Sequence, residues 1–165
     1  MIEFDLRITQ KLRIAEQKGL FRTLSVFLAH SGDSWFWLAA LAMMWVLGNQ
    51  YWKYRALVLF IAIVFTALVV FVVKKIFRRK RPEGEWGQFY RLTDPHSFPS
   101  GHTVRAVMLA VIMLGLGPLW LGLVLLVWAP LVGLARIAMG VHYLTDVLAG
   151  AILGLIVGGV VLIIL

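Results

Sequence analysis

The sequence contains no cysteine, and it is poor in acidic residues. The absence of cysteine excludes disulfides and thiolate metal sites, and it leaves the redox compartment without its usual indicator. Only 8 Asp and Glu residues stand against 16 Lys and Arg residues, which gives a formal net charge of +8. The basic residues are divided among segments that flank apolar runs. Nucleic acid is therefore not an expected partner, and anionic lipid headgroups or phosphate are favoured.

Charged residues make up only 15% of the 165 positions, whereas 61% are hydrophobic. The mean hydropathy is +0.89, far above that of a soluble domain. Apolar runs of about 17 to 22 residues match the roughly 30 Å hydrocarbon core of a bilayer. The sequence thus predicts an all-α integral membrane protein, one domain over residues 1–165, with about five transmembrane helices. The predicted spans are 34–49, 55–77, 101–117, 119–138 and 144–165.

The N-terminal segment follows a different pattern. Residues 3–19 place apolar side chains on one helical stripe, which is typical of an amphipathic helix on the membrane surface. Residues 20–31 are apolar but too short to cross a bilayer. Gly32-Asp33-Ser34 then indicates a break and a helix N-cap. We expect interfacial helices over 1–33 and a transmembrane catalytic core over 34–165.

Three polar motifs lie at the ends of the apolar segments. They are Lys74-x6-Arg81-Pro82, Pro99-Ser100-Gly101-His102 and Arg136-x5-His142-x3-Asp146. The links between most neighbouring spans are short, so these spans should be antiparallel. The one long loop, 78–100, contains several prolines and glycines and is expected to be irregular. This topology brings all three motifs to one membrane face, which predicts a single site.

The first motif supplies cations. Lys74 and Arg81 are two helical turns apart and can point from one helix face. Arg offers a planar fork for phosphate oxygens, and Lys a point charge. The alternative interpretation is a basic cluster that flanks the membrane, because four more Lys and Arg residues lie between and beside them.

The second motif precedes an apolar helix, whose N-terminus presents free N–H groups and a positive dipole end to an anion. Gly101 would let the backbone approach a phosphate, and Ser100 could cap the helix or donate. His102 would be placed to give a proton to a leaving oxygen. An ordinary capped helix start with an interfacial histidine is the alternative.

The third motif pairs His142 with Asp146 at i and i+4, on one helix face. Asp146 could accept from one ring nitrogen and leave the other free to attack phosphorus. An acidic residue at the head of an apolar span is costly without such a partner. Arg136 would neutralise developing charge on the phosphoryl oxygens. The alternative is a snorkelling arginine beside a structural His–Asp pair.

The remaining polar residues are expected to play lesser parts. His30 and His96 lack informative spacing and are interpreted as interfacial, and Arg105 could reach the site or face a headgroup. The loop acids Asp94, Glu83 and Glu85 are expected to be solvated. No cluster of His, Asp and Glu has convincing metal spacing, so we expect no metal and no cofactor.

The three motifs resemble those of the type 2 phosphatidic acid phosphatase superfamily of membrane lipid phosphatases, K-x6-R-P, P-S-G-H and S-R-x5-H-x3-D. The resemblance covers roughly residues 34–165. It implies that His142 is the nucleophile that forms a phosphohistidine, that His102 is the general acid and that Asp146 orients His142. The phosphate would be held by Lys74, Arg81, Ser100, Gly101 and Arg136.

Ala135 replaces the usual serine before the third-motif arginine, so a phosphate hydrogen bond could be missing. A surface helix also takes the place of the usual first span, giving five spans instead of six.

The expected function is metal-independent hydrolysis of a lipid phosphate or diphosphate of the polyprenyl, phosphatidylglycerophosphate or phosphatidate type. A lipid phosphotransferase using the same histidine is one alternative, and a non-catalytic lipid-binding or transport protein is another.

The expected partners are the lipid substrate and membrane lipids, without nucleic acid, and the oligomeric state is left open. We expect a prokaryotic cell membrane. The bias of basic residues toward the motif-bearing face favours a cytoplasmic site, although many members of the family work on the outer face.

Overall fold

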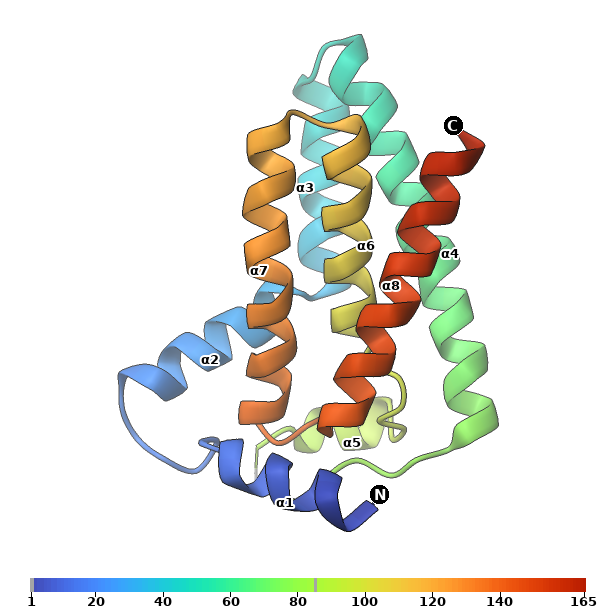
Figure 1. Cartoon of the computed structure of the whole chain (residues 1–165). Coiled ribbons are helices and arrows are strands. Elements are labelled where there is room, and N and C mark those ends of the chain that lie inside the picture. The colour runs from blue at the N-terminus through green and yellow to red at the C-terminus, as the bar shows by residue number, and fades with distance from the viewer. Residues whose placement is uncertain (1, 85) are drawn as a thin grey trace.

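The computed structural model describes residues 2–84 and 86–165, so Met1 and Glu85 lie outside the described chain. Over these residues it has eight helices and, besides them, one isolated bridge between Lys80 and His96 (Figure 1). The helices are α1 (Ile2–Leu12), α2 (Leu20–Ser31), α3 (Ser34–Leu47), α4 (Gln50–Phe77), α5 (Gln88–Thr93), α6 (Gly101–Leu116), α7 (Leu119–Ala138) and α8 (Leu144–Ile164).

The predicted all-α class is confirmed, and α3, α4, α6, α7 and α8 begin and end within a few residues of the predicted spans. Three of them, α4, α7 and α8, have the length and hydropathy needed to cross a membrane. The other two, α3 and α6, are apolar but have only 14 and 16 residues. The chain is thus a helical membrane protein, and the crossing by five helices stays a prediction.

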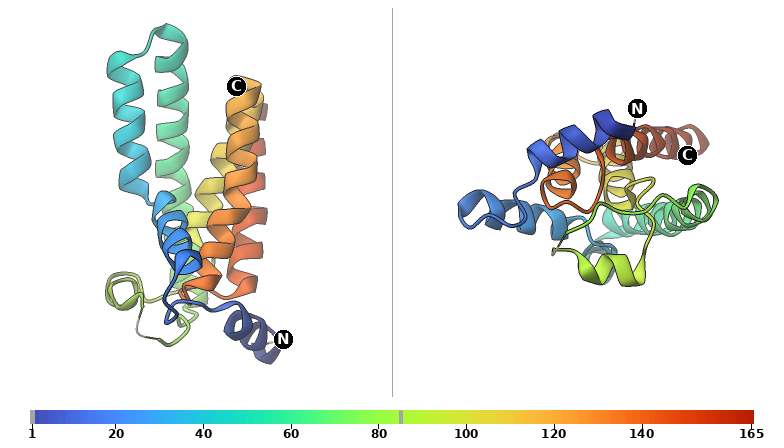
Figure 2. Two further views of the ribbon diagram at one scale, coloured as in Figure 1. Left: turned by 90° about the vertical axis from the view of Figure 1, so that its left-hand side faces the viewer. Right: turned by 90° about the horizontal axis from the view of Figure 1, so that it is seen from below.

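The long helices form two groups. Helix α6 packs closely against α7 and α8, whereas α3 pairs with α4. The left view of Figure 2 shows the α3–α4 hairpin standing beside the other group, with its far end splayed away. Glycines on α8 allow the close approach to α6, since a Cβ on Gly150 would lie 2.8 Å from the carbonyl oxygen of Ser100, and one on Gly154 would lie 2.6 Å from that of Val104. This contact fixes the start of α6 beside the start of α8.

The N-terminal helix is shorter than predicted. It ends at Leu12 instead of residue 19, because the backbone of Ile14 donates to the carbonyl of Ala138 at 2.8 Å and is no longer available to a helix. Helix α1 lies across one end of the bundle, and α2 slants outward from α7 (Figure 1). The predicted N-terminal amphipathic helix is therefore present in a shortened form.

The predicted irregular loop 78–100 contains the short helix α5. Gly87, with a positive φ of 83°, precedes it. Arg91 ties the preceding turn together by donating to the carbonyls of Pro82, Gly84 and Trp86. Seen along the bundle in the right view of Figure 2, α5 lies over the same end as α1.

Candidate active site

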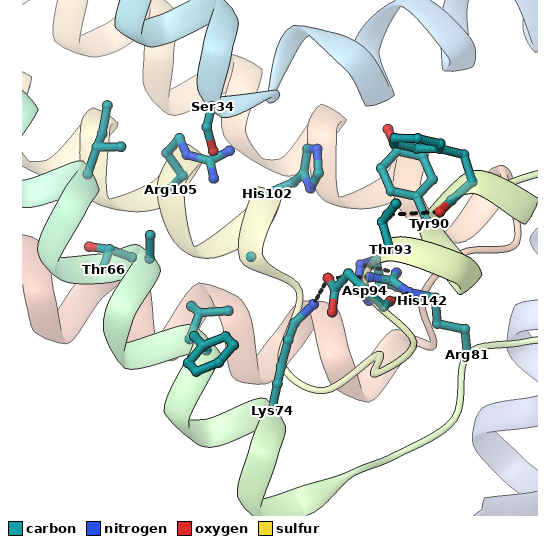
Figure 3. Close-up of a pocket in the computed structure, with 16 residues that line it drawn as sticks. Ser34, Thr66, Lys74, Arg81, Tyr90, Thr93, Asp94, His102, Arg105 and His142 are labelled. Atoms are coloured by element: carbon teal, nitrogen blue, oxygen red, sulfur yellow. Dashed lines mark hydrogen bonds and ion pairs between the residues drawn. The ribbon is translucent and has the colours of Figure 1, made fainter.

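A cavity of about 330 Å³ lies at the end of the bundle covered by α5 (Figure 3). Each of the three motifs contributes to its lining: Lys74 and Arg81 from the first, Gly101 and His102 from the second, and His142 from the third. The predicted convergence of the motifs is therefore observed. Ile63, Thr66, Ala67, Val70 and Phe71 extend the lining along α4 into the apolar part of the bundle.

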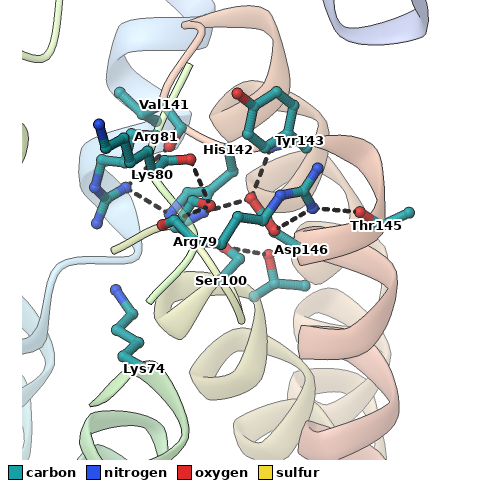
Figure 4. Close-up of polar contacts among 12 residues, drawn as sticks. Lys74, Arg79, Lys80, Arg81, Ser100, Val141, His142, Tyr143, Thr145 and Asp146 are labelled. Atoms are coloured by element: carbon teal, nitrogen blue, oxygen red, sulfur yellow. Dashed lines mark hydrogen bonds and ion pairs between the residues drawn. The ribbon is translucent and has the colours of Figure 1, made fainter. Parts of the chain in front are cut away.

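His142 lies between α7 and α8, just after a turn in which Gly140 has a φ of 65°. Its side chain is 1% exposed, and its Nε2 is 3.0 Å from Nη1 of Arg81. A guanidinium can only donate, so Nε2 must be the acceptor and carries the lone pair. The ring proton of neutral His142 is then on Nδ1, the nitrogen on the side of Asp146 (Figure 4).

Asp146 is held rigidly at the first turn of α8. Its Oδ2 accepts from the backbone N–H of Tyr143 at 2.9 Å, and its Oδ1 accepts from Nη1 of Arg79 at 2.8 Å. The distance from Oδ2 to Nδ1 of His142 is 3.5 Å, longer than a good hydrogen bond. Catalytic contacts of this kind tighten when a substrate binds. The pair has the arrangement expected of a nucleophilic histidine and the carboxylate that orients it.

The surroundings of His142 favour the neutral ring. Burial lowers the pKa of His142 well below its usual value of 6.5, and the positive charges of Arg81, Arg136 and Lys74 lower it further. A histidine with a low pKa keeps its lone pair at neutral and mildly acidic pH. The cations that would attract a phosphate thus also keep the ring unprotonated.

Lys74 and Arg81 share one anion in this structure. Asp94, the residue that follows α5, accepts from both Lys74 Nζ and, at 2.7 Å, Arg81 Nη2 (Figure 3). The prediction that Asp94 is merely solvated was wrong: its side chain is 43% exposed, but the carboxylate is paired with two buried cations. A carboxylate therefore marks the place where the first-motif cations converge.

Arg136 is fully buried, and most of its donors are unused. Over the described residues, Nε and Nη2 have no hydrogen-bond partner, and Nη1 reaches only the carbonyl oxygen of Ala29, at 3.5 Å. The guanidinium lies 4.4 Å from the centre of the Tyr90 ring. Buried donors left unpaired are uncommon and costly. Arg136 is not among the residues that line the cavity, but its unpaired donors give it free positive hydrogen-bonding capacity.

The two other predicted phosphate ligands differ in position. Gly101 lines the cavity at the start of α6. Ser100 is fully buried beside it and is not part of the lining: its hydroxyl accepts from Thr103 at 3.0 Å, and its backbone N–H donates to the carbonyl of Asp146 at 2.9 Å. In this structure Ser100 joins α6 to α8 and does not face the cavity.

Ala135, which stands where the family usually has a serine, lies in an apolar environment. Ala135 is 3% exposed and packs in a small apolar cluster with Ala15, Ala29 and Met139. The side chain at this position is therefore directed to the contact of α7 with the N-terminal segment.

His102 has a partner that sequence reasoning missed. Its Nε2 lies 2.6 Å from Oδ1 of Asp33, in the link between α2 and α3. Asp33 was predicted only as an N-cap; it occupies that position, but its side chain makes no capping hydrogen bond. His30, predicted to be interfacial, contacts the same carboxylate through Nδ1 at 3.0 Å. The separation of 69 residues between Asp33 and His102 gave no local signal for the pair.

Arg105, left open by the sequence, donates to the carbonyl of Gly32 and also lines the cavity. Within residues 2–84 and 86–165, no group of three or more His, Cys, Asp or Glu side chains is arranged to hold a metal ion.

Comparison with known proteins places the chain in a family. The model of the PAP2 superfamily matches residues 55–165. The chain belongs to the PAP2 superfamily. It is 31% identical over 148 residues to an undecaprenyl-diphosphatase of Sulfolobus acidocaldarius, a match that covers 87% of this chain and 70% of that protein. It is 35% identical over 95 residues to a decaprenylphosphoryl-5-phosphoribose phosphatase of Mycobacterium tuberculosis, covering 56% of this chain and 51% of the relative.

Two solved structures share the fold. The crystal structure of Aquifex aeolicus LpxE superposes with a TM-score of 0.76 at 27% identity, covering 95% of this chain and 93% of that one. A transmembrane PAP2-type phosphatidylglycerolphosphate phosphatase from Bacillus subtilis superposes with a TM-score of 0.75 at 24% identity, covering 96% and 83%. The predicted resemblance is confirmed, and the chain is a membrane enzyme of the lipid phosphate phosphatase class.

Proposed function

We propose that this PAP2 enzyme hydrolyses a polyprenyl phosphate or diphosphate through a phosphohistidine on His142. The observation that carries the proposal is the contact of Arg81 Nη1 with Nε2 of His142, which directs the lone pair of that nitrogen toward the cations. A phosphoryl oxygen would take over the N–H of Arg81 and free the lone pair for attack. Lys74, Arg81 and Arg136 would take the phosphoryl oxygens and stabilise the charge that develops on them. Asp146 would hold the Nδ1–H side of the ring.

The reaction has two steps. Nε2 of His142 attacks phosphorus while the bond from phosphorus to the leaving oxygen breaks, and His102 gives that oxygen a proton. In the second step, water attacks the phosphorus of the phosphohistidine and the P–N bond breaks. His102 takes the proton from the water, inorganic phosphate leaves, and both histidines return to their starting state. A diphosphate follows the same steps with a lipid monophosphate as the leaving group.

The polyprenyl assignment is supported by the cavity and by two relatives. The wall formed by Ile63, Ala67, Val70 and Phe71 of α4 is apolar and runs from the cation cluster toward the middle of the bundle. A lipid chain could lie along this wall with its phosphate at Lys74 and Arg81. The undecaprenyl-diphosphatase and the decaprenylphosphoryl-5-phosphoribose phosphatase both carry polyprenyl groups in the names of their activities.

The test is phosphate release by the purified protein in detergent with EDTA. Substrates would be undecaprenyl phosphate and diphosphate, phosphatidylglycerophosphate and phosphatidate. We expect the polyprenyl substrates to be preferred, the activity to survive the chelator, and His142→Ala to abolish release. His96→Gln, which changes a histidine outside the cavity, is the matched control. With radiolabelled substrate, the wild type should yield an acid-labile, alkali-stable phosphoprotein that His142→Ala lacks. Full activity in His142→Ala would refute the mechanism, and preference for phosphatidate would refute the substrate class.

A further inference from the structure

The general acid expected at His102 is held by a residue outside the three motifs. The 2.6 Å contact between Nε2 of His102 and Oδ1 of Asp33 joins the second motif to the link between α2 and α3. Both side chains are largely withdrawn from solvent, at 16% and 15% exposure. A hydrogen bond of this length between an imidazole and a carboxylate is of the strong, charge-assisted kind.

The carboxylate of Asp33 is itself fixed on its other side. Its Oδ2 lies 3.0 Å from Nδ1 of His30, and the hydroxyl of Tyr90 lies 3.4 Å from the same nitrogen. These contacts form a chain that runs from α5 through α2 to His102. Burial alone would raise the pKa of Asp33, but its hydrogen bonds to His102 and His30 outweigh burial and hold the pKa below its usual range. Asp33 is therefore a fixed negative charge beside the ring.

The backbone around Asp33 is equally constrained. A Cβ at Gly32 would come within 3.1 Å of both Cδ2 of His102 and Cγ1 of Val132, tighter than most real contacts. Arg105 donates to the carbonyl of Gly32 from one turn further along α6. The link is thus packed directly against the ring of His102, and a glycine is needed there for close approach.

The groups that face His102 explain why a negative charge is needed. They are Asp33 from the α2–α3 link, Tyr90 from α5, Arg136 from α7 and Arg105 from its own helix. Two of the four are permanent cations, which oppose a protonated imidazole. Asp33 is the group that offsets them. Without it, none of the charged groups that face the ring would favour the protonated imidazole.

We propose that Asp33 is a positioning residue that makes His102 the general acid. This inference rests on the proposed function. Asp33 accepts from Nε2–H, which leaves Nδ1 as the nitrogen available to substrate; in the described residues Nδ1 has no hydrogen-bond partner. His102 lines both the cavity of about 330 Å³ and a neighbouring one of about 640 Å³, so a substrate in either cavity would lie against this residue.

Each proton in the proposed reaction can be followed through both steps. As the bond from phosphorus to the leaving oxygen breaks, that oxygen takes the proton of Nδ1, and His102 becomes neutral while Nε2–H still donates to Asp33. When water attacks the phosphohistidine, its proton returns to Nδ1. Asp33 keeps its charge throughout and transfers no proton, as expected for a carboxylate that orients a histidine.

The experiment compares Asp33→Asn with wild type on two substrates. A lipid monophosphate has a basic alkoxide leaving group that needs the proton, whereas p-nitrophenyl phosphate has an acidic one that does not. We expect kcat on the lipid to fall at least about tenfold with little change of KM. The rate of phosphohistidine formation from p-nitrophenyl phosphate, measured in a rapid-quench burst, should stay near that of wild type, since only the later hydrolysis of the phosphohistidine uses His102 with this substrate. The basic limb of the pH profile on the lipid should move to lower pH, because the ring loses its counter-charge.

Controls separate this inference from the proposed function. In a His102→Gln background, Asp33→Asn should have no further effect on the lipid rate, because the two residues act as one unit. His142→Ala should lose both substrates, and if it does not, the proposed function fails whatever Asp33 does. Glu3→Gln, an exposed acid on α1, is the matched control and should behave as wild type.

Three outcomes would overturn the role of Asp33 while His142→Ala is inactive. One is an Asp33→Asn protein with an unchanged or higher kcat on the lipid, which would mean that Asp33 merely restrains His102. Another is an equal loss on both substrates. The third is an additive effect in the His102→Gln background. Should Asp33→Asn not fold, Asp33→Glu, which retains the charge but shifts it by one methylene, replaces it with the same expected dependence on the leaving group.

Discussion

Nη1 of Arg81 lies 3.0 Å from Nε2 of His142. Because the guanidinium can only donate, this single contact fixes where the lone pair of the ring is and which nitrogen faces the phosphate site. It also places a permanent positive charge next to the atom that would be phosphorylated. The same arginine donates through Nε to the carbonyl oxygen of Asp94 at 2.7 Å, so its position is set by the loop and not only by the ring.

Removal of Arg81 should therefore damage the chemical step. For Arg81→Ala, we expect kcat to fall roughly 100-fold to 1000-fold, the range seen when a preorganised donor to transition-state charge is lost. Arg78→Ala is a suitable control, since Arg78 is exposed and its Nε bonds only the carbonyl of Lys75, at 2.9 Å. Steady-state phosphate release measures both. An equal loss in the two variants would point to general membrane or headgroup attraction in place of a role at the site.

The pH profile should report the cations around His142. Burial and three positive charges lower the pKa of His142, so the ring stays neutral when the pH falls below 6.5. Protonation inactivates a nucleophile, and the acidic limb of kcat/KM assigned to His142 should accordingly lie below that pH. Replacing Arg81 by Gln removes one positive charge, raises the pKa and should move this limb to higher pH. The substrate ionises in the same way with both proteins, so any difference between their acidic limbs comes from the enzyme. If the acidic limbs of the wild type and the Arg81→Gln variant coincide, the limb does not report His142.

The N-terminal helix should matter for stability and, through Arg79, for the site. Asp5 of α1 is 2% exposed, accepts from Arg79 at 2.6 Å, and accepts from the backbone N–H of Thr145 at 3.1 Å (Figure 4 shows Arg79 with Asp146 and Thr145). Arg79 also holds Asp146. Because Arg79 is a quarter exposed, Asp5→Ala should cost no more than about 2–3 kcal/mol. We expect a lower melting temperature in detergent and a modest loss of kcat.

The control for Asp5 is Glu3→Ala on the same helix. Glu3 pairs with Arg7, but both side chains are at least 75% exposed, so the loss should be negligible. Comparable destabilisation of the two variants would mean that α1 contributes through its backbone or its apolar face and not through Asp5.

Site contacts between residues close in the sequence could be predicted, whereas contacts between residues far apart in the sequence could not. The short separations of His142 from Asp146 and of Lys74 from Arg81 predicted that each pair would lie close together. The predicted shared helix faces were wrong, because α4 ends at Phe77 before Arg81 and α8 begins at Leu144 after His142. The helices themselves were visible because a bilayer demands long apolar runs. Asp33, Asp5 and Asp94 were missed, since each acts on a residue 20 or more positions away and nothing in its local sequence distinguishes it from a solvated acid or a helix cap.

Ser100 shows how tertiary packing sets the direction of a motif side chain. Its place in the motif predicted contact with phosphate, but the close packing of α6 on α8, which the glycines of α8 permit, turns its hydroxyl to Thr103. Such a choice between two nearby partners is made by tertiary packing, which local sequence does not encode.

Asp94 should compete with substrate for the cations of the first motif. Its carboxylate accepts from Lys74 and Arg81, the groups that would bind phosphate. In Asp94→Asn the negative charge is gone, so inorganic phosphate should inhibit at a several-fold lower concentration, since the anion no longer displaces a charged competitor. Glu83→Gln, an exposed acid of the same loop, serves as control. The inhibition constant for phosphate measures the effect, and an unchanged or higher constant would mean that Asp94 supports the binding geometry instead of opposing the anion.

The side of the membrane that carries the site can be decided on the chain itself, because it has no cysteine. Gln88 of α5 lies at the end with the site, and Gln50 starts α4 at the opposite end (Figure 1). Both residues are exposed. The bias of Lys and Arg toward the first end favours a cytoplasmic site, even though several of these charges have a second reason to be there, namely phosphate. A membrane-impermeant thiol reagent added to intact cells should thus label a cysteine at position 50 and spare one at position 88. The reverse pattern would place the cations, and the lipid headgroup they bind, on the outer face.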